Sequence, residues 1–98
     1  MAPSGRERLD DDGIGAALAG LDGWDREGDQ IMRDFEFRDF VEAAGFLMRV
    51  AILAQAADHH PEIWNVYNRV RLTLSTHDSG GITQLDVDLA GQVNALLA

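Results

Sequence analysis

Three histidines lie in two short stretches, and they are the residues of this chain best suited to moving protons. The first stretch is Asp58-His59-His60-Pro61-Glu62, and the second is Ser75-Thr76-His77-Asp78-Ser79-Gly80-Gly81. Imidazole titrates near neutral pH, so two imidazoles on opposite sides of one ligand can remove one proton and deliver another. We expect the chemistry of the protein where these two stretches meet.

Each histidine also has a plain structural interpretation, which the pattern leaves open. His59 or His60 taken alone fits a helix-capping or surface residue, and His77 taken alone fits a polar residue in a turn. All three histidines of the chain nevertheless fall in these two loop-like segments. That confinement favours a shared site as much as it favours separate structural roles.

Other chemistries are rivals for the same residues. Three imidazoles with Asp58, Asp78 or Asp86 could complete a zinc sphere, but no histidine pair has the i, i+4 spacing that presets two ligands on a helix. Ser75 and Thr76 lack the strained elbow of a serine nucleophile, and the glycines lack P-loop spacing. The pattern favours proton transfer by the imidazoles over these rivals.

A long helix is expected to position the first stretch. Apolar residues recur at three-to-four spacing from Arg38 to Ala57, and Pro61 disfavours helical geometry for the residue before it, so the helix must end at the histidines. The helix has two apolar faces; the first comprises Phe40, Ala44, Leu47, Met48 and Ala51, and the second comprises Ala43, Phe46, Val50, Leu53, Ala54 and Ala57.

Two apolar faces on one helix indicate two packing partners. We expect one face to pack on a sheet and the other on a second subunit, as a homodimer or homotetramer, although a helix fully buried in its own domain is the alternative. An acidic substitution at Phe46 is predicted to disturb this assembly.

Strands and two further helices are expected around the long helix. The acids at positions 10–12 indicate a helix start, preferred here over a metal site, with Gly23 as a possible stop. Alternating residues predict one hairpin over 24–37, with a turn at Gly28-Asp29, and another over 63–75, in which Asn68 tolerates the turn. In the second hairpin Val70, Leu72 and Leu74 are expected to face inward.

A last helix is expected to run to the chain end. Thr83 and Asp86 resemble a capping pair, and the inward stripe of this helix is Leu85, Leu89, Val93 and Leu96. The order helix, two strands, helix, two strands, helix predicts an α+β two-layer sandwich. In it, three helices cover one face of a four-stranded antiparallel sheet.

Length and charge limit the possible functions. The 98 residues suit one domain, which we place at 9–98 after a flexible terminus at 1–8. Eight Lys and Arg against 17 Asp and Glu give a net charge of -9, which argues against nucleic acid or an anionic membrane as a partner. No apolar run approaches the ~20 residues of a membrane span, and cysteine is absent, so a cytoplasmic protein is expected.

The two histidine stretches resemble the hallmark of the pterin-4a-carbinolamine dehydratase family. That hallmark is a His-His-Pro segment followed by a strand pair ending in Thr-His and then by a Gly and an Asp. The resemblance extends from about Leu9 to the C-terminus. It rests on Gly23-Trp24, Phe35-Glu36-Phe37-Arg38-Asp39-Phe40, Gly45-Phe46-Leu47-Met48-Arg49-Val50-Ala51, Asp58-His59-His60-Pro61-Glu62, Asn65-Val66-Tyr67-Asn68, Leu74-Ser75-Thr76-His77, Gly81-Ile82-Thr83 and Asp86.

The resemblance implies a reaction that uses neither a metal nor an organic cofactor, and it implies a set of site residues. It implies that water is lost from a 4a-hydroxytetrahydropterin to give the quinonoid dihydropterin, which keeps the tetrahydropterin of an aromatic amino-acid hydroxylase in circulation. His59 and His77 would act as acid and base in an unassigned order, and His60 would hold the pterin. Asp58, Ser75, Thr76, Asp78 and Asp86 would bind substrate, with Asp86 either orienting a histidine or contacting the ring.

The resemblance also implies a rival function of a different class. Animal members of the family serve as dimerisation partners of a homeodomain transcription factor through the long helix. The apolar helix at 38–57 would permit such a contact with another protein.

Overall fold

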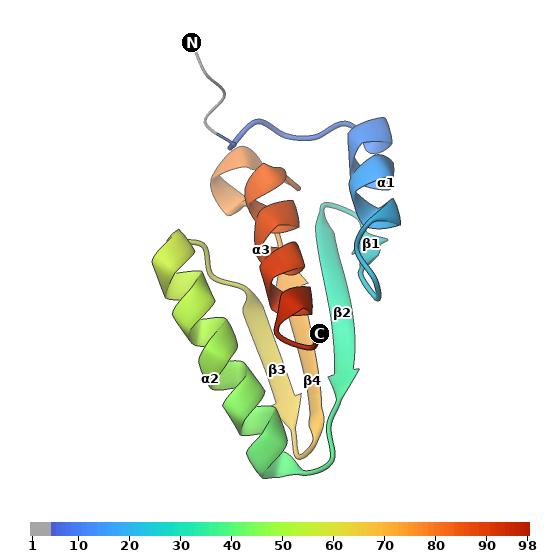
Figure 1. The fold of residues 1–98 in the computed structure, drawn as a ribbon. Helices are drawn as coiled ribbons and strands as arrows, with labels where there is room; N and C mark the ends of the chain where they lie inside the picture. The colour runs from blue at the N-terminus through green and yellow to red at the C-terminus, as the bar shows by residue number, and fades with distance from the viewer. Residues whose placement is uncertain (1–4) are drawn as a thin grey trace.

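The structure, a computed structural model, describes residues 5–98 as helices layered on one face of a four-stranded sheet (Figure 1). The elements are α1 (Asp11–Ala19), β1 (Asp25–Glu27), β2 (Gln30–Glu36), α2 (Phe40–Ala57), β3 (Glu62–Val66), β4 (Arg69–Leu74), a 3₁₀ turn η1 (His77–Ser79) and α3 (Gln84–Ala95). The strands lie in the order β1-β2-β4-β3, and every neighbouring pair is antiparallel. The expected α+β fold and its element order are confirmed.

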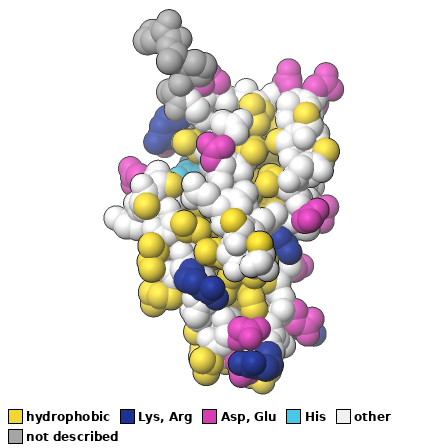
Figure 2. All heavy atoms as spheres, viewed as in Figure 1, with side chains coloured by type: hydrophobic (Ala, Val, Ile, Leu, Met, Phe, Trp, Pro, Cys, Tyr) yellow, Lys and Arg dark blue, Asp and Glu magenta, His cyan; other side chains and the backbone are white. Residues whose placement is uncertain are grey.

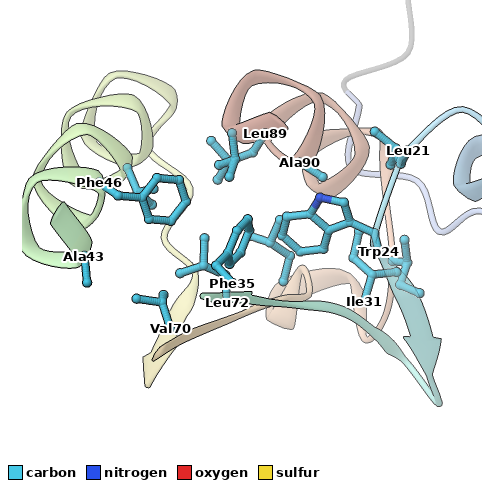
Figure 3. Close-up of a cluster of buried hydrophobic side chains, with 14 of the residues drawn as sticks. Leu21, Trp24, Ile31, Phe35, Ala43, Phe46, Val70, Leu72, Leu89 and Ala90 are labelled. Atoms are coloured by element: carbon cyan, nitrogen blue, oxygen red, sulfur yellow. The ribbon is translucent and has the colours of Figure 1, made fainter. Parts of the chain in front are cut away.

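The core lies between the helices and the central strands. Val70, Leu72 and Leu74 of β4 are at most 1% exposed, so the inward stripe expected for this strand is confirmed. Figure 3 shows Phe46 of α2 facing Phe35 of β2, and the centroids of the two rings are 4.8 Å apart. This packing holds α2 against the sheet and so sets the position of its C-terminal end, from which the first histidine stretch begins.

Side-chain caps set where the helices begin. Asp10 caps α1 by accepting a hydrogen bond from the Gly13 N–H at 2.8 Å, so the run of acids is a helix start. The helix ends at Gly20, three residues before the expected Gly23. Asp39 accepts a hydrogen bond from the Glu42 N–H and starts α2 two residues later than expected.

The inner face of α2 consists of the residues of the second apolar set. Ala43, Phe46, Val50 and Ala54 are buried, and Phe46 is fully buried against the sheet. The prediction that Phe46 would report on a subunit interface is therefore wrong. An acidic group there would enter the core of the monomer and unfold it.

The outer face of α2 is apolar and open to solvent. Val41, Met48 and Ile52 are 78%, 65% and 63% exposed, and Figure 2 shows hydrophobic side chains gathered along this helix at the left edge of the view. By length and composition alone α2 could cross a membrane, contrary to the sequence expectation. Its opposite face, however, is built into the core, so membrane insertion would dismantle the fold.

The second hairpin turns at Tyr67 and Asn68, so the turn expected at Asn68 is confirmed. Tyr67, rather than Asn68, has the left-handed backbone, with φ 50°. The Asn68 side chain instead donates a hydrogen bond to the Phe37 carbonyl at 2.8 Å, which ties the hairpin to the end of β2. β3 lies at the edge of the sheet, and its Trp64 and Val66 are about half exposed.

Candidate active site

The first histidine stretch begins at a sharply defined helix end. Asp58 takes the left-handed conformation, with φ 49° and ψ 43°. Its N–H donates to the Gln55 carbonyl at 3.2 Å, and the His59 N–H donates to the Ala54 carbonyl at 3.1 Å. These two bonds form the helix ending in which glycine is the usual left-handed residue. A strained aspartate at this point turns the chain so that His59 and His60 leave the helix in fixed directions.

The second stretch is a tight loop beyond β4. Thr76 pairs with Gly81, its N–H donating to the Gly81 carbonyl at 2.9 Å, and η1 fills the space between them. Gly80 closes the turn with φ 74°, a conformation that favours glycine. The loop leaves Thr76 buried and presents His77 to solvent.

The two stretches meet at one pocket of about 330 Å³. Its described lining comprises Arg6, Asp58, His59, His60, Ser75, Thr76, His77 and Asp78. The structure thus brings together the three histidines and four of the five other residues expected at the site. It adds Arg6, which no pattern in the sequence indicated.

Asp86 lies behind the pocket wall and holds His59 in place. Its carboxylate is fully buried, and His59 Nε2 lies 2.6 Å from its Oδ1. Its Oδ2 accepts hydrogen bonds from the Thr76 hydroxyl and the Thr83 N–H, both at 2.9 Å. Of the two roles expected for Asp86, the geometry therefore supports orienting a histidine and not contact with the ring of the substrate.

The same carboxylate completes the expected cap of α3. Thr83 and Asp86 form a reciprocal capping box at the start of this helix. The Thr76 and Thr83 hydroxyl oxygens are 2.7 Å apart. Because a carboxylate can only accept, Thr76 donates to Asp86, and Thr83 then donates to Thr76. This buried chain of bonds joins the end of α2, the loop after β4 and the start of α3.

The contact with Asp86 also selects a tautomer for His59. A carboxylate next to Nε2 requires the proton to be on Nε2, which leaves Nδ1 as the ring nitrogen with a free lone pair in neutral imidazole. The side chain is only 9% exposed, so its orientation is fixed by packing as well as by hydrogen bonding. In this tautomer the neutral ring can accept a proton only at Nδ1.

The other two histidines lie nearer to solvent. His60 Nε2 is 3.1 Å from the Gln55 side-chain oxygen, and His77 is exposed on the turn η1. Both also line a small adjoining hollow with Ser75 and Thr73. Within residues 5–98, no group of three or more His, Asp or Glu side chains is arranged to hold a metal ion.

A second hollow, of about 350 Å³, lies on the open face of the sheet but lacks comparable chemistry. Its charged residues are Asp34, Glu36, Arg69 and Arg71, and Arg71 donates two hydrogen bonds, of 2.7 and 3.2 Å, to Asp34. The hydrogen bond from Arg71 lowers the pKa of Asp34, and the same bond raises the pKa of Arg71. The described lining of this hollow contains no histidine, so the pocket at the three histidines is the candidate active site.

The fold and the pocket together define a class of protein. It is a small α+β domain in which imidazoles and carboxylates converge at one end of an open antiparallel sheet, equipped to exchange protons with a small ligand. Comparison with known proteins identifies the family. The chain belongs to the pterin 4 alpha carbinolamine dehydratase family, whose model matches residues 7–96.

Relatives and solved structures agree with this assignment. A Bradyrhizobium protein named "Putative pterin-4-alpha-carbinolamine dehydratase" is 52% identical over 94% of this chain and 95% of its own length. A Rhodopseudomonas palustris protein with the same name is 51% identical over 94% and 93%. A Brucella melitensis structure, described as a transcriptional coactivator/pterin dehydratase, matches with a TM-score of 0.91 and 42% identity, covering 94% of this chain and all of that one.

A more distant structure shares the fold alone. It is described as a pterin dehydratase-like protein that is a RuBisCO assembly factor in the alpha-carboxysome. Its TM-score is 0.62, with 23% identity over 74% of this chain and 84% of its own.

Proposed function

We propose that the protein removes water from 4a-hydroxytetrahydropterin to give the quinonoid dihydropterin. In this reaction the C4a–O bond breaks, N5 loses its proton and a C4a–N5 double bond forms, so the leaving hydroxide takes up a proton and departs as water. The reaction needs one base and one acid on a single ligand. The observation that carries the proposal is the convergence of three imidazoles on one pocket in a member of this family.

The contacts of His59 and His77 favour a division of roles between them. His59, with its proton held on Nε2 by Asp86, offers Nδ1 as the base that accepts the proton from N5. His77 is exposed and can exchange protons with solvent, which suits the acid that protonates the departing hydroxide. His60, on the same wall, would hold the pterin ring.

Stopped-flow spectroscopy of chemically generated 4a-hydroxytetrahydropterin tests this proposal. Wild type should accelerate loss of the substrate, while His59→Ala and His77→Ala should each slow turnover by about 10²- to 10⁴-fold. Gln92→Ala, at an exposed position on α3, should behave as wild type. If wild type gives no acceleration, the enzyme assignment is wrong; if both histidine variants are fully active, the roles are wrong.

The physiological setting remains a prediction of the same proposal. The quinonoid product is the form that must be reduced to restore a tetrahydropterin, so the enzyme would support tetrahydropterin recycling. The cytoplasmic location expected from the sequence also stays a prediction.

We further propose that the outer face of α2 joins copies of this chain into a homodimer or homotetramer. Val41, Met48 and Ile52 lie along one side of the helix at spacings of seven and four residues, and all three are more than 60% exposed. Such a row of large apolar side chains is typical of a helix-to-helix contact. The alternative is that this face binds a different protein, in line with the coactivator description of the Brucella structure.

Mass measurement by light scattering separates these possibilities. Met48→Glu should lower the mass of the assembly towards that of the monomer, whereas Gln92→Glu should leave it unchanged. A wild type that is monomeric at high concentration would refute self-association and would favour the contact with another protein.

A further inference from the structure

Residues 5–9 pass along the turn η1, and Arg6 of this segment lines the pocket. In Figure 1 this dark blue segment crosses the top of the molecule beside the orange turn that leads into α3. The Ser79 hydroxyl donates to the Arg6 carbonyl, and the Leu9 N–H donates to the Ile82 carbonyl at 2.9 Å. Arg8 packs on Gly81 so closely that a Cβ there would lie 3.1 Å from its Nε. The segment is therefore anchored at the Arg6 backbone and at the residues that follow it.

The side chain of Arg6 lies at the outer lip of the pocket. Its Nη1 is 3.8 Å from Asp78 Oδ2, and the two side chains are 49% and 89% exposed. The inner wall is formed by the more deeply buried His59 and Thr76. Of the eight described lining residues, Arg6 alone carries a permanent positive charge. The outer lip of the pocket therefore carries a permanently charged hydrogen-bond donor, Arg6, beside a carboxylate acceptor, Asp78.

The donor and acceptor match one edge of a pterin. The pyrimidine ring of a pterin presents a carbonyl oxygen at C4, which accepts, next to an N–H at N3, which donates. A guanidinium can donate to the first while a neighbouring carboxylate accepts from the second. An anionic substituent fits less well, because Asp58 and Asp78 outnumber Arg6 among the permanent charges of the lining.

We propose that Arg6 is a substrate-positioning residue that, together with Asp78, recognises the C4 carbonyl and N3–H of the pterin. This inference rests on the proposed function only in taking a reduced pterin as the ligand. Holding the amide edge at the lip would orient the ring so that its reacting bond reaches the histidines.

Equilibrium binding of an unreactive reduced pterin tests the inference without turnover. The probes are 7,8-dihydropterin and its 2,4-diamino analogue, which has an amino group in place of the C4 carbonyl and lacks the N3–H. Wild type should prefer the oxo compound. Arg6→Ala should bind it about tenfold more weakly, as expected for the loss of one charge-assisted hydrogen bond, and should lose the preference. Arg6→Lys should restore part of the affinity for the oxo compound and part of the preference over the diamino analogue.

Arg26→Ala is the matched control, because Arg26 pairs with Asp11 at 2.8 Å outside the pocket. It should leave both affinities unchanged. Equal weakening of both ligands by Arg6→Ala, or no weakening at all, would overturn the inference. A wild type that binds dihydropterin with this preference but does not accelerate dehydration would refute the proposed function alone, and a wild type that binds neither ligand would refute both.

Discussion

Replacing Asp86 by asparagine should damage the chemistry far more than the fold. The carboxylate accepts three hydrogen bonds, from the His59 ring, the Thr76 hydroxyl and the Thr83 N–H. Asparagine has one acceptor oxygen, which can serve the last two of these donors. Its amide nitrogen then faces His59 Nε2 and can bond only if the histidine proton moves to Nδ1. The variant would fold with the wrong tautomer of its base.

The size of each effect follows from these bonds. Charge-assisted bonds are replaced by neutral ones at a fully buried position, so the free energy of unfolding should fall by about 2 kcal/mol. Because the cap of α3 is retained, the fold should survive this loss. The free lone pair on Nδ1 disappears, however, so the rate of dehydration should fall by about 10²- to 10⁴-fold.

Two measurements on the same variant check this reasoning. Stopped-flow spectroscopy gives the rate, and nitrogen-15 NMR of the imidazoles gives the tautomer of His59. The control is Asp88→Asn, which changes an exposed acid on the same helix that accepts a hydrogen bond from Gln84. A wild-type rate in Asp86→Asn, or a lost rate with His59 still protonated on Nε2, would refute the link between tautomer and activity.

Three further predictions concern the fold. Asp58→Ala should lower the free energy of unfolding, measured by urea denaturation, by about 1 kcal/mol, whereas Asp58→Gly should not lower it. Only glycine adopts the left-handed helix end without strain, so equal free energies of unfolding in the two variants would contradict this reasoning. Phe46→Ala should lower the free energy of unfolding of the monomer by about 3 to 5 kcal/mol and Met48→Ala by much less, because only the Phe46 side chain is buried. Similar losses in the two variants would refute the assignment of the inner and outer faces of α2. The pKa of Asp34 is lowered from 3.8 by Arg71, so the stability that this pair adds is present above that value and is lost as the pH falls through the lower folded pKa. The gap between wild type and Asp34→Asn in urea melts should therefore close on acidification, and a constant gap would contradict the pairing.

Much of the fold could be predicted because residue patterns in the sequence match the burial and the helix caps found in the structure. The alternation of Val70, Leu72 and Leu74 matches a strand buried on one face, and the Thr83 and Asp86 spacing matches a real capping box. Helical periodicity could show that α2 has two apolar faces, but not which of them meets the sheet. That choice depends on where the helix starts and how it crosses the strands, so the prediction for Phe46 failed.

The site was predictable where its residues were contiguous. The two histidine stretches supply seven of the eight described lining residues. Arg6 was not predictable, because it is remote in sequence from its neighbours and lies in a segment without apolar periodicity. Only the path of the chain over η1 brings it to the pocket. The burial of Asp86 could not be foreseen either, since the same spacing serves an exposed helix cap equally well.

The edge position of β3 has a practical consequence for handling the protein. Its outer backbone groups and the half-exposed Trp64 and Val66 could pair with the same strand of another copy, while a net charge of -9 opposes this strand-to-strand contact near neutral pH. Acidification neutralises the carboxylates and removes that repulsion without hiding the strand. Concentrated stocks should therefore stay clear in neutral, low-salt buffer and turn cloudy when titrated towards the range in which carboxylates protonate.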